Sequence, residues 1–261
     1  MLPLSNYILR LKNLANYNGN LTLRMWRYND KNMKIITLPS SELGSTSLES
    51  SSLLIFMPFI HPPVAKRTAE TLARRSGISD ASLVCIFDLK REGFVSLVNR
   101  AFKSSESAFV VYLAEDAFPG RDWLKIGLDA LIAQKAGLLG FNDGKWQGEL
   151  AAFGLVERAW AQKNYAGDLF YPQYHQHYAD TELTLLAKND KAYAYNPHSM
   201  LLEVDWDKDQ KSTNALDKAL FQERVKTGFD QRVDDPSLLE MFSWSRNSWT
   251  ARISPKRIGW C

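Results

Sequence analysis

The sequence has little cysteine and no long apolar run among its 261 residues. Its two cysteines, Cys85 and Cys261, are too few for a disulfide framework or a cysteine-based zinc site, which is typical of a reducing compartment. No stretch approaches the ~18 consecutive apolar residues of a membrane-spanning helix, so an integral membrane protein is not expected. With 32 basic and 29 acidic residues, a net charge of +3, the chain also lacks the excess charge of a non-specific nucleic-acid binder.

Motifs of several enzyme classes are also missing. The chain has neither a Gly-x-x-x-x-Gly-Lys-Ser/Thr loop nor a Gly-x-Gly-x-x-Gly after its first apolar run, which argues against P-loop and dinucleotide chemistry. His198 precedes Ser199 without a Gly-x-Ser-x-Gly elbow, so a nucleophilic hydrolase is not expected. His175 and His177 lack a close third ligand for zinc. The N-terminal residues show no secretion signal pattern, so we expect a cytoplasmic protein.

Apolar runs alternate with amphipathic segments from residue 53 onward. The apolar runs are 53–57, 82–87 and 109–113. The segments with helical spacing are 64–75, 94–102 and 124–132. This order predicts an α/β fold with a mainly parallel sheet flanked by helices. Ligands bind at the carboxyl ends of such strands, so the residues that follow each run are the candidates for a site.

The second half of the chain is less regular. The expected elements are a strand entering a glycine-punctuated loop over 137–148, a short helix over 153–162, a loop entering a helix over 171–188 and a strand over 200–206. No internal repeat is visible, so a solenoid is not expected.

Composition divides the chain into three regions. Alternating residues over 20–39, about a turn at 29–32, predict a small β-hairpin, and the serine-rich segment after it predicts a linker. We therefore expect an N-terminal extension over 1–50, the main domain over 51–210 and a C-terminal extension over 211–261 that packs on it. The last region joins a predicted helix to an aromatic, basic end, which either rests on anionic lipid headgroups or packs back on the domain.

Carboxylates follow two of the predicted strands. Glu115 and Asp116 either hold Mg²⁺ or Mn²⁺ bridged to a diphosphate, or cap the helix that begins near Arg121. Asp88 either accepts hydrogen bonds from a nucleobase or ribose, or is a solvated turn residue. Both positions fit a nucleotide site at the end of a sheet.

Further polar residues lie in the second half. Asp180 begins a predicted helix, where it either caps the helix or serves as a general base toward an acceptor hydroxyl. Glu182 lies on a different face of that helix, so the two carboxylates are not expected to work as a pair. The segment Phe-Asn-Asp-Gly-Lys-Trp predicts either a tight turn or a contact of Asn142, Asp143 and Trp146 with a polyhydroxylated ligand.

Four motifs occur in an informative order. LLIFMPFIHPP joins an apolar strand to a proline-containing turn with Pro58 and His61, and VCIFD ends on Asp88. The stretch from Gly93 to Asn99 has the form G-x(5)-N, and YLAEDAFPGRDWL joins an acidic motif to Pro-x-x-x-Trp-Leu. In this order the motifs resemble the inverting GT-A glycosyltransferases of family 2. The resemblance implies a GT-A-like, Rossmann-like catalytic domain with a nucleotide-sugar donor.

The second half resembles the same family. FGLVER is similar to the family's acceptor-side segment and contributes Arg158, and ADTELTLLA resembles its acidic helix start, whose first acid is usually the catalytic base. The acidic motif reads Ala-Glu-Asp where the family has Asp-x-Asp, so the resemblance assigns the cation to Asp116 with Glu115 assisting. Glu203 falls about where the family places a histidine ligand, and His198 is the alternative.

The resemblance thus implies a complete set of site residues. They are Asp180 as catalytic base; Pro58, His61, Asp88, Asn99 and Glu115 for the donor; Asp116 and Glu203 for the metal; and Asn142, Asp143, Trp146, Arg158 and Glu182 for the acceptor. The implied partners are a nucleotide-sugar and a glycan or glycolipid acceptor, with no nucleic acid.

The implied activity is transfer of a sugar to a hydroxyl group with inversion, using Mn²⁺ or Mg²⁺, in the cytoplasm or at the inner face of the membrane. A bacterial surface polysaccharide or lipopolysaccharide is the implied acceptor class. Two alternatives stay open, namely a catalytically degenerate GT-A domain that acts as a binding or assembly module, and another nucleotide-diphosphate-dependent transferase.

Overall fold

The computed structural model describes residues 28–29, 33–45, 48, 52–204 and 214–242. The strands are β1 (Tyr28–Asn29), β2 (Lys34–Pro39), β3 (Leu53–Phe59), β4 (Ala81–Phe87), β5 (Phe109–Tyr112), β6 (Ala117–Pro119), β7 (Leu138–Asn142), β8 (Gly154–Glu157) and β9 (Tyr193–Glu203). The helices are η1 (Ser40–Glu42), α2 (Pro62–Arg74), α3 (Phe94–Lys103), α4 (Trp123–Ala133), α5 (Arg158–Ala161), α6 (Ala179–Asn189), α7 (Ala215–Lys226), α8 (Gly228–Gln231) and α9 (Pro236–Met241).

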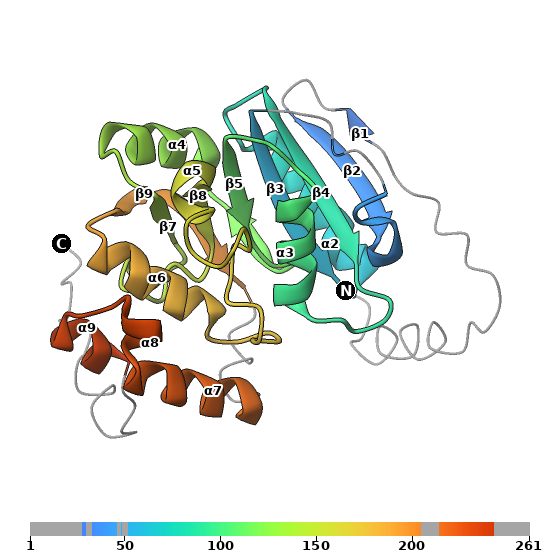
Figure 1. The fold of residues 1–261 in the computed structure, drawn as a ribbon. Coiled ribbons are helices and arrows are strands. Elements are labelled where there is room, and N and C mark those ends of the chain that lie inside the picture. The colour runs from blue at the N-terminus through green and yellow to red at the C-terminus, as the bar shows by residue number, and fades with distance from the viewer. Residues whose placement is uncertain (1–27, 30–32, 46–47, 49–51, 205–213, 243–261) are drawn as a thin grey trace, which may run out of the picture.

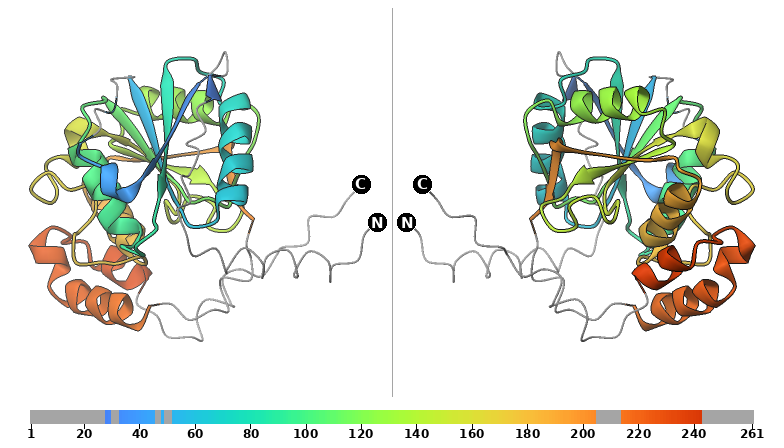
Figure 2. Two further views of the ribbon diagram at one scale, coloured as in Figure 1. Left: turned by 90° about the vertical axis from the view of Figure 1, so that its right-hand side faces the viewer. Right: turned by 90° about the vertical axis from the view of Figure 1, so that its left-hand side faces the viewer.

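The strands form one nine-stranded sheet in the order β1-β2-β4-β3-β5-β8-β7-β9-β6. Parallel pairing joins β2, β4, β3 and β5, and again β7 and β9, whereas the other described neighbours are antiparallel. Helices pack on both faces (Figures 1 and 2). The predicted α/β sheet is therefore confirmed, and its second half is mixed because β8 inserts antiparallel between β5 and β7.

Most elements of the main domain lie where the sequence predicts them, but strand β6 was not predicted and one segment was assigned to the wrong type of element. The segment 153–162 is not a single short helix, because strand β8 comes first and the one-turn helix α5 follows it. A run of four apolar residues is too short to show a period, so pairing with both neighbouring strands decides its structure. Residues 200–203 of the strand predicted over 200–206 form the second part of the longer β9, whereas residues 205–206 lie outside the described residues.

The predicted N-terminal hairpin continues the sheet. β1 pairs antiparallel with β2, while most of the first predicted strand lies outside the described residues. β2 also pairs in parallel with β4 from Lys34 opposite Ser82 to Pro39 opposite Phe87. The proposed division of the chain near residues 50 and 210 stays a prediction, but β2 belongs to the same sheet as the main domain.

Alternate residues of the central strands pack into two hydrophobic cores, one on each face of the sheet. Leu54 and Phe56 of β3 face the core under α3 and α6, whereas Ile55 and Met57 face the core under α2 and α4. This alternation follows from the two-residue period of a strand and explains why β3 and β4 are apolar except for the buried Ser82 of β4.

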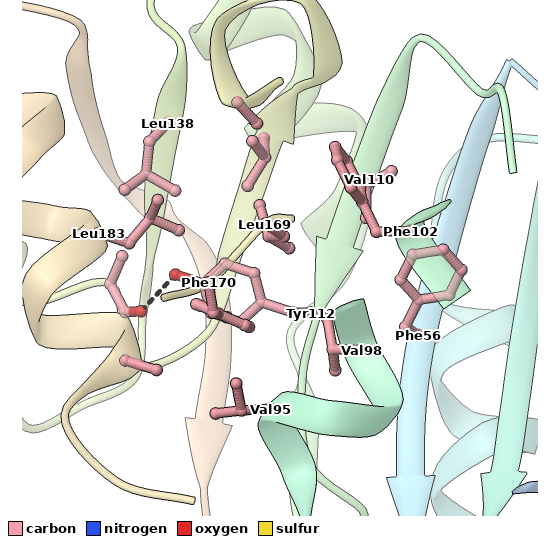
Figure 3. Close-up of a cluster of buried hydrophobic side chains, with 14 of the residues drawn as sticks. Phe56, Val95, Val98, Phe102, Val110, Tyr112, Leu138, Leu169, Phe170 and Leu183 are labelled. Carbon is pink, nitrogen blue, oxygen red and sulfur yellow. Dashed lines mark hydrogen bonds between the residues drawn. The ribbon is translucent and has the colours of Figure 1, made fainter. Parts of the chain in front are cut away.

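Figure 3 shows part of the first core, in which aromatic rings from strand, helix and loop meet. Tyr112 at the end of β5 packs edge-on against Phe170 with ring centres 4.9 Å apart, and its hydroxyl donates a 2.7 Å hydrogen bond to the carbonyl of Ala151. The loop that precedes α6 is thereby tied to the end of a central strand.

The C-terminal helix α7, which the sequence predicts, is joined to α6 by a buried ion pair. The Arg224 guanidinium donates to both oxygens of Glu182 at 2.7 and 2.6 Å, and the hydroxyls of Tyr165 and Tyr174 donate to the same carboxylate. Every oxygen of this buried charge is thus satisfied. Across the described part of the chain, the helices are too short or too polar to cross a bilayer.

Candidate active site

A cleft of about 750 Å³ opens at the carboxyl ends of β3, β4 and β5. Five of the predicted site residues line it, namely Pro58, His61, Asp88, Glu115 and Asp116. They come together because parallel neighbours end at the same edge of a sheet, although the three segments are far apart in the sequence. The placement of the cleft therefore agrees with the prediction from the strand ends.

Glu115 connects the ends of β5 and β3. Its Oε2 accepts hydrogen bonds from the backbone N–H groups of Ile60 (3.3 Å) and His61 (2.9 Å), and its Oε1 lies 2.8 Å from Nδ1 of His61. A hydrogen bond at Nδ1 leaves Nε2 as the ring atom that a ligand can reach, and the His61 side chain is 63% exposed. In this geometry Glu115 orients His61.

Asp88 shapes the turn between β4 and α3. Its two oxygens accept hydrogen bonds from the backbone N–H groups of Glu92 (2.8 Å) and Gly93 (3.0 Å), and the side chain is buried. The geometry supports the interpretation of Asp88 as a turn residue. Because each carboxylate oxygen has a second lone pair, a residue at this place in the cleft wall can also accept from a ligand.

Gly93 allows the cleft wall to form. Its φ of +92° is a conformation that L side chains rarely adopt, and a Cβ there would lie 2.7 Å from Nε2 and from the carbonyl oxygen of His175. Glycine is required at this position for both reasons. Sequence reasoning did not assign His175 and Gln176 to the cleft, which they line. No local motif in the sequence marks these two residues as part of the cleft wall. His175 reaches the wall by packing against Gly93.

Asp116 and Glu203 lie at neighbouring positions of the sheet edge. Ala117 of β6 is opposite Glu203 of β9, and the N–H of Val204 donates to the carbonyl of Asp116. No group of three or more His, Cys, Asp or Glu residues within the described ranges is placed to hold a metal. Mg²⁺ and Mn²⁺ usually take one or two carboxylates plus substrate phosphates, and a cation held by Asp116 and Glu203 stays a prediction. Asp116 lines the cleft, whereas Glu203 and the alternative His198 both lie outside its described lining.

Asp180 is the second residue of α6, whose cap position is Tyr178. Burial raises the pKa of the Asp180 carboxyl to about 6, and the nearby charge of Asp143 adds to the rise. Hydrogen bonds oppose the rise, above all the one from the N–H of Thr181 at 2.8 Å, with a weaker one from the Thr181 hydroxyl at 3.4 Å. A carboxylate that is ionised at neutral pH but more basic than usual suits a general base.

The segment with Asn142, Asp143 and Trp146 forms a hydrogen-bonded turn after β7. Oδ1 of Asp143 accepts from the N–H groups of Lys145 (2.9 Å) and Trp146 (2.8 Å), and burial raises the pKa of this carboxyl. Asn142 accepts from the N–H of Gly144 and donates to a neighbouring carbonyl. The turn interpretation is thus supported, and a role toward an acceptor stays a prediction.

Eight predicted residues lie outside the described lining of the cleft, namely Asp180, Glu203, Asn142, Asp143, Trp146, Arg158, Asn99 and Glu182. The last three bind groups of the chain interior. Arg158 donates to oxygens of the segment 102–107 at 2.6, 3.1 and 2.8 Å. Asn99 exchanges two hydrogen bonds with the backbone of Phe170 at 3.0 and 2.9 Å. Glu182 is the fully buried partner of the ion pair with α7. Their geometry is that of framework residues, because their polar atoms are engaged in the interior.

Two arginines also line the cleft without having been predicted. Arg67 lies on α2, and Arg91 lies in the turn after β4 with a φ of +57°. Guanidinium groups are well suited to phosphate oxygens. In the sequence, the one feature that marks these two arginines as candidates for the cleft is that each follows the end of a strand.

Comparisons with known proteins bear on the fold. No family model and no curated protein sequence matches this chain. Among solved structures, Staphylococcus aureus TarS 1–349 in complex with UDP-GlcNAc matches with a TM-score of 0.55 and 12% identity, covering 78% of this chain and 76% of that one. The same protein in complex with UDP gives a TM-score of 0.52 at 12% identity, covering 78% and 75%.

A mannosyltransferase, PcManGT from Pyrobaculum calidifontis in complex with GDP-Man and Mn²⁺, matches with a TM-score of 0.45 and 12% identity, over 85% of this chain and 68% of that one. Identities this low establish likeness of fold alone. The predicted GT-A-like fold, a sheet flanked by helices, is confirmed.

Proposed function

We propose that this protein is a glycosyltransferase that moves a sugar from a nucleotide-sugar to a hydroxyl group of a glycan or glycolipid, with inversion at the anomeric carbon. The observation that carries the proposal is the cleft at the ends of β3, β4 and β5, where Asp88, His61 and Asp116 converge. TarS, which has a similar fold, was solved with UDP-GlcNAc and with UDP, and this supports a nucleotide-sugar as the ligand.

The donor lies along this cleft. Asp88, beside Pro58, accepts hydrogen bonds from the nucleoside, while the guanidinium groups of Arg67 and Arg91 donate to the diphosphate. The exposed His61 ring donates through Nε2 when both of its nitrogens carry protons, because Nδ1 faces Glu115. Mn²⁺ or Mg²⁺ held by Asp116 and Glu203 supplies positive charge to the departing diphosphate. Glu115 contributes through His61, which it holds in place.

The reaction is a single displacement. The Asp180 carboxylate takes the proton of the acceptor hydroxyl, whose oxygen forms a bond to C1 of the sugar. The bond from C1 to the phosphate oxygen breaks on the opposite face, and the electron pair leaves with the diphosphate. The product therefore has the inverted configuration. The turn with Asn142, Asp143 and Trp146 lies on the acceptor side in this arrangement.

The acceptor class is a bacterial surface polysaccharide or lipopolysaccharide, made at the cytoplasmic face of the membrane. Exposed apolar side chains at the cleft support an amphipathic acceptor, because Val64, Phe118 and Val204 line the cleft and are 43%, 46% and 57% exposed. Apolar groups at the rim of a polar cleft are favourable where a ligand covers them. Peripheral contact with the membrane belongs to the same proposal.

A thermal-shift screen tests the proposed function. UDP, GDP, CMP and dTDP are each added with and without Mn²⁺ to wild type and to Asp116→Ala, with Asp129→Ala on the exposed face of α4 as the control. We expect one nucleotide at ~100 times its Kd to add about 2.7 kcal/mol of stability. The shift requires Mn²⁺ and Asp116 and persists in Asp129→Ala. Absence of a shift with every nucleotide contradicts the proposal and favours a binding or assembly module.

A further inference from the structure

A buried carboxylate from α7 holds one wall of the cleft. Asp217 is 2% exposed, and it accepts hydrogen bonds from the backbone N–H groups of three consecutive residues. These are His175 at 2.8 Å, through Oδ1, and Gln176 and His177 at 2.9 Å, through Oδ2. His175 and Gln176 line the cleft, whereas α7 belongs to the C-terminal helices that lie beside α6 (Figure 1).

The helix that presents this carboxylate is anchored at both ends. Oδ1 of Asn214 caps its first turn by accepting from the N–H groups of Leu216 and Asp217. Asp217, Phe221 and Arg224 form its buried face at a helical spacing of four and three residues. Because Arg224 is fixed by the buried ion pair with α6, Asp217 is presented on a rigid support.

The opposite side of the loop is held by α3. The carbonyl of His175 accepts a 3.2 Å hydrogen bond from the N–H of Val95, and the His175 ring and carbonyl lie against the bare Cα of Gly93. The loop 175–177 is therefore clamped between α3 and α7. An ionised aspartate suits three converging donors because it only accepts, with two oxygens and several lone pairs.

We propose that Asp217 is a positioning residue for donor binding, because it fixes the wall formed by His175 and Gln176 at the place where the cleft holds a nucleoside diphosphate. The identity of the ligand in this inference rests on the proposed function, whereas the clamp itself rests on the hydrogen bonds to Asp217. Replacement of the carboxylate by an amide leaves three N–H groups that the new side chain is unable to satisfy together, since an amide has one acceptor oxygen.

The test compares Asp217→Asn with Asp230→Asn. Both remove one negative charge at constant size, and Asp230, 65% exposed, pairs with Arg224 of the same C-terminal segment instead of with the loop. Titration calorimetry measures the Kd of UDP and of GDP with Mn²⁺, at a temperature where circular dichroism shows each variant folded. Hydrogen exchange follows the amides of residues 175–177 in the same samples.

We expect Asp217→Asn to raise the Kd of the nucleotide that wild type binds by about tenfold or more, and to speed exchange of the three amides, while Asp230→Asn changes neither. Should Asp217→Asn not fold, Asp217→Glu, which keeps the charge but moves it by one methylene, is expected to show a smaller rise in the same Kd. Faster exchange with an unchanged Kd overturns the positioning role and leaves the proposed function standing. Failure of wild type to bind either nucleotide refutes the proposed function and, with it, the ligand named here.

Discussion

The carboxylates of the site differ in what surrounds them. Asp88 and Glu115 receive two or more hydrogen bonds, mostly from backbone N–H groups, which fix the side chain. Asp180 receives hydrogen bonds only from Thr181 among the described residues, one from the backbone N–H and a longer one from the hydroxyl, and burial raises its pKa to about 6. Groups of the same chemical type are thereby separated into anchors and a proton acceptor.

Asp180→Asn tests the base. We expect the rate of sugar transfer to fall by about 10²- to 10⁴-fold, and the wild-type rate to fall as the pH drops through about 6, because protonated Asp180 no longer accepts a proton. Transfer is measured with the donor that the thermal-shift screen identifies. A variant with wild-type activity contradicts the assignment.

The same variant has a stability signature. The folded-state pKa of Asp180 is above its ordinary value of 3.8, so ionisation opposes folding, and this loss of stability develops as the pH rises from about 4 through 6. At pH 8, Asp180→Asn is therefore expected to be more stable than wild type by about 1 to 3 kcal/mol, and below pH 4 the difference vanishes. Urea denaturation at both pH values measures it, with Asp129→Asn on α4 as a control that changes little.

At the scale of elements, the turn between β4 and α3 forms a joint, that is, the place where the cleft wall meets the loop that precedes α6. It begins with Asp88 at the strand end, passes through Arg91 in a left-handed conformation and ends at Gly93, the cap of α3. The loop that precedes α6 packs on this glycine. The β4–α3 turn and the loop before α6 thus touch at Gly93 and His175, although they are distant in the sequence. We expect a change in the turn to displace the loop.

Gly93→Ala tests this joint, with Gly167→Ala as a matched control. Both glycines have similar φ values, +92° and +90°, but no described atom lies within 4 Å of a Cβ on Gly167, whereas His175 lies 2.7 Å from one on Gly93. We expect Gly167→Ala to cost about 1 kcal/mol and Gly93→Ala about 2 to 4 kcal/mol in the free energy of unfolding. Equal losses would show that the contact with His175 contributes nothing.

At the scale of the molecule, the C-terminal segment supplies partners for buried polar groups of the main domain. α7 satisfies a buried charge through Arg224 and three backbone N–H groups through Asp217. Both sets of partners belong to the region before residue 205. The described part of the region predicted as a C-terminal extension is therefore integral to the packing around α6.

Removal of residues 211–261 tests this dependence. Without Arg224, the fully buried Glu182 is left as an unpaired charge, which costs about 3 to 5 kcal/mol, so we expect the truncated chain to lose its cooperative thermal unfolding. The same truncation carrying Glu182→Gln removes the charge and is expected to recover part of that stability. A truncated chain with the Tm of the full chain would show that α7 is dispensable.

The sequence by itself indicated most of the strands and helices and the place of the cleft, although it did not indicate β6 and assigned the segment of β8 to a helix. Asp88, Glu115 and Asp116 directly follow buried apolar runs, and the end of such a run is a local property that needs no knowledge of partners. The carboxyl ends of parallel strands then meet by geometry alone. The GT-A-like resemblance of the motifs agrees with the fold for the same reason.

Only the tertiary structure decided which polar residues serve the framework and which line the cleft. Arg158, Asn99 and Glu182 find their partners in distant segments, so no local spacing separates them from residues of a site. Asp217 reaches His175 across 42 residues of chain. Such contacts form when helices pack against one another, because buried polar groups must find partners wherever the fold brings them.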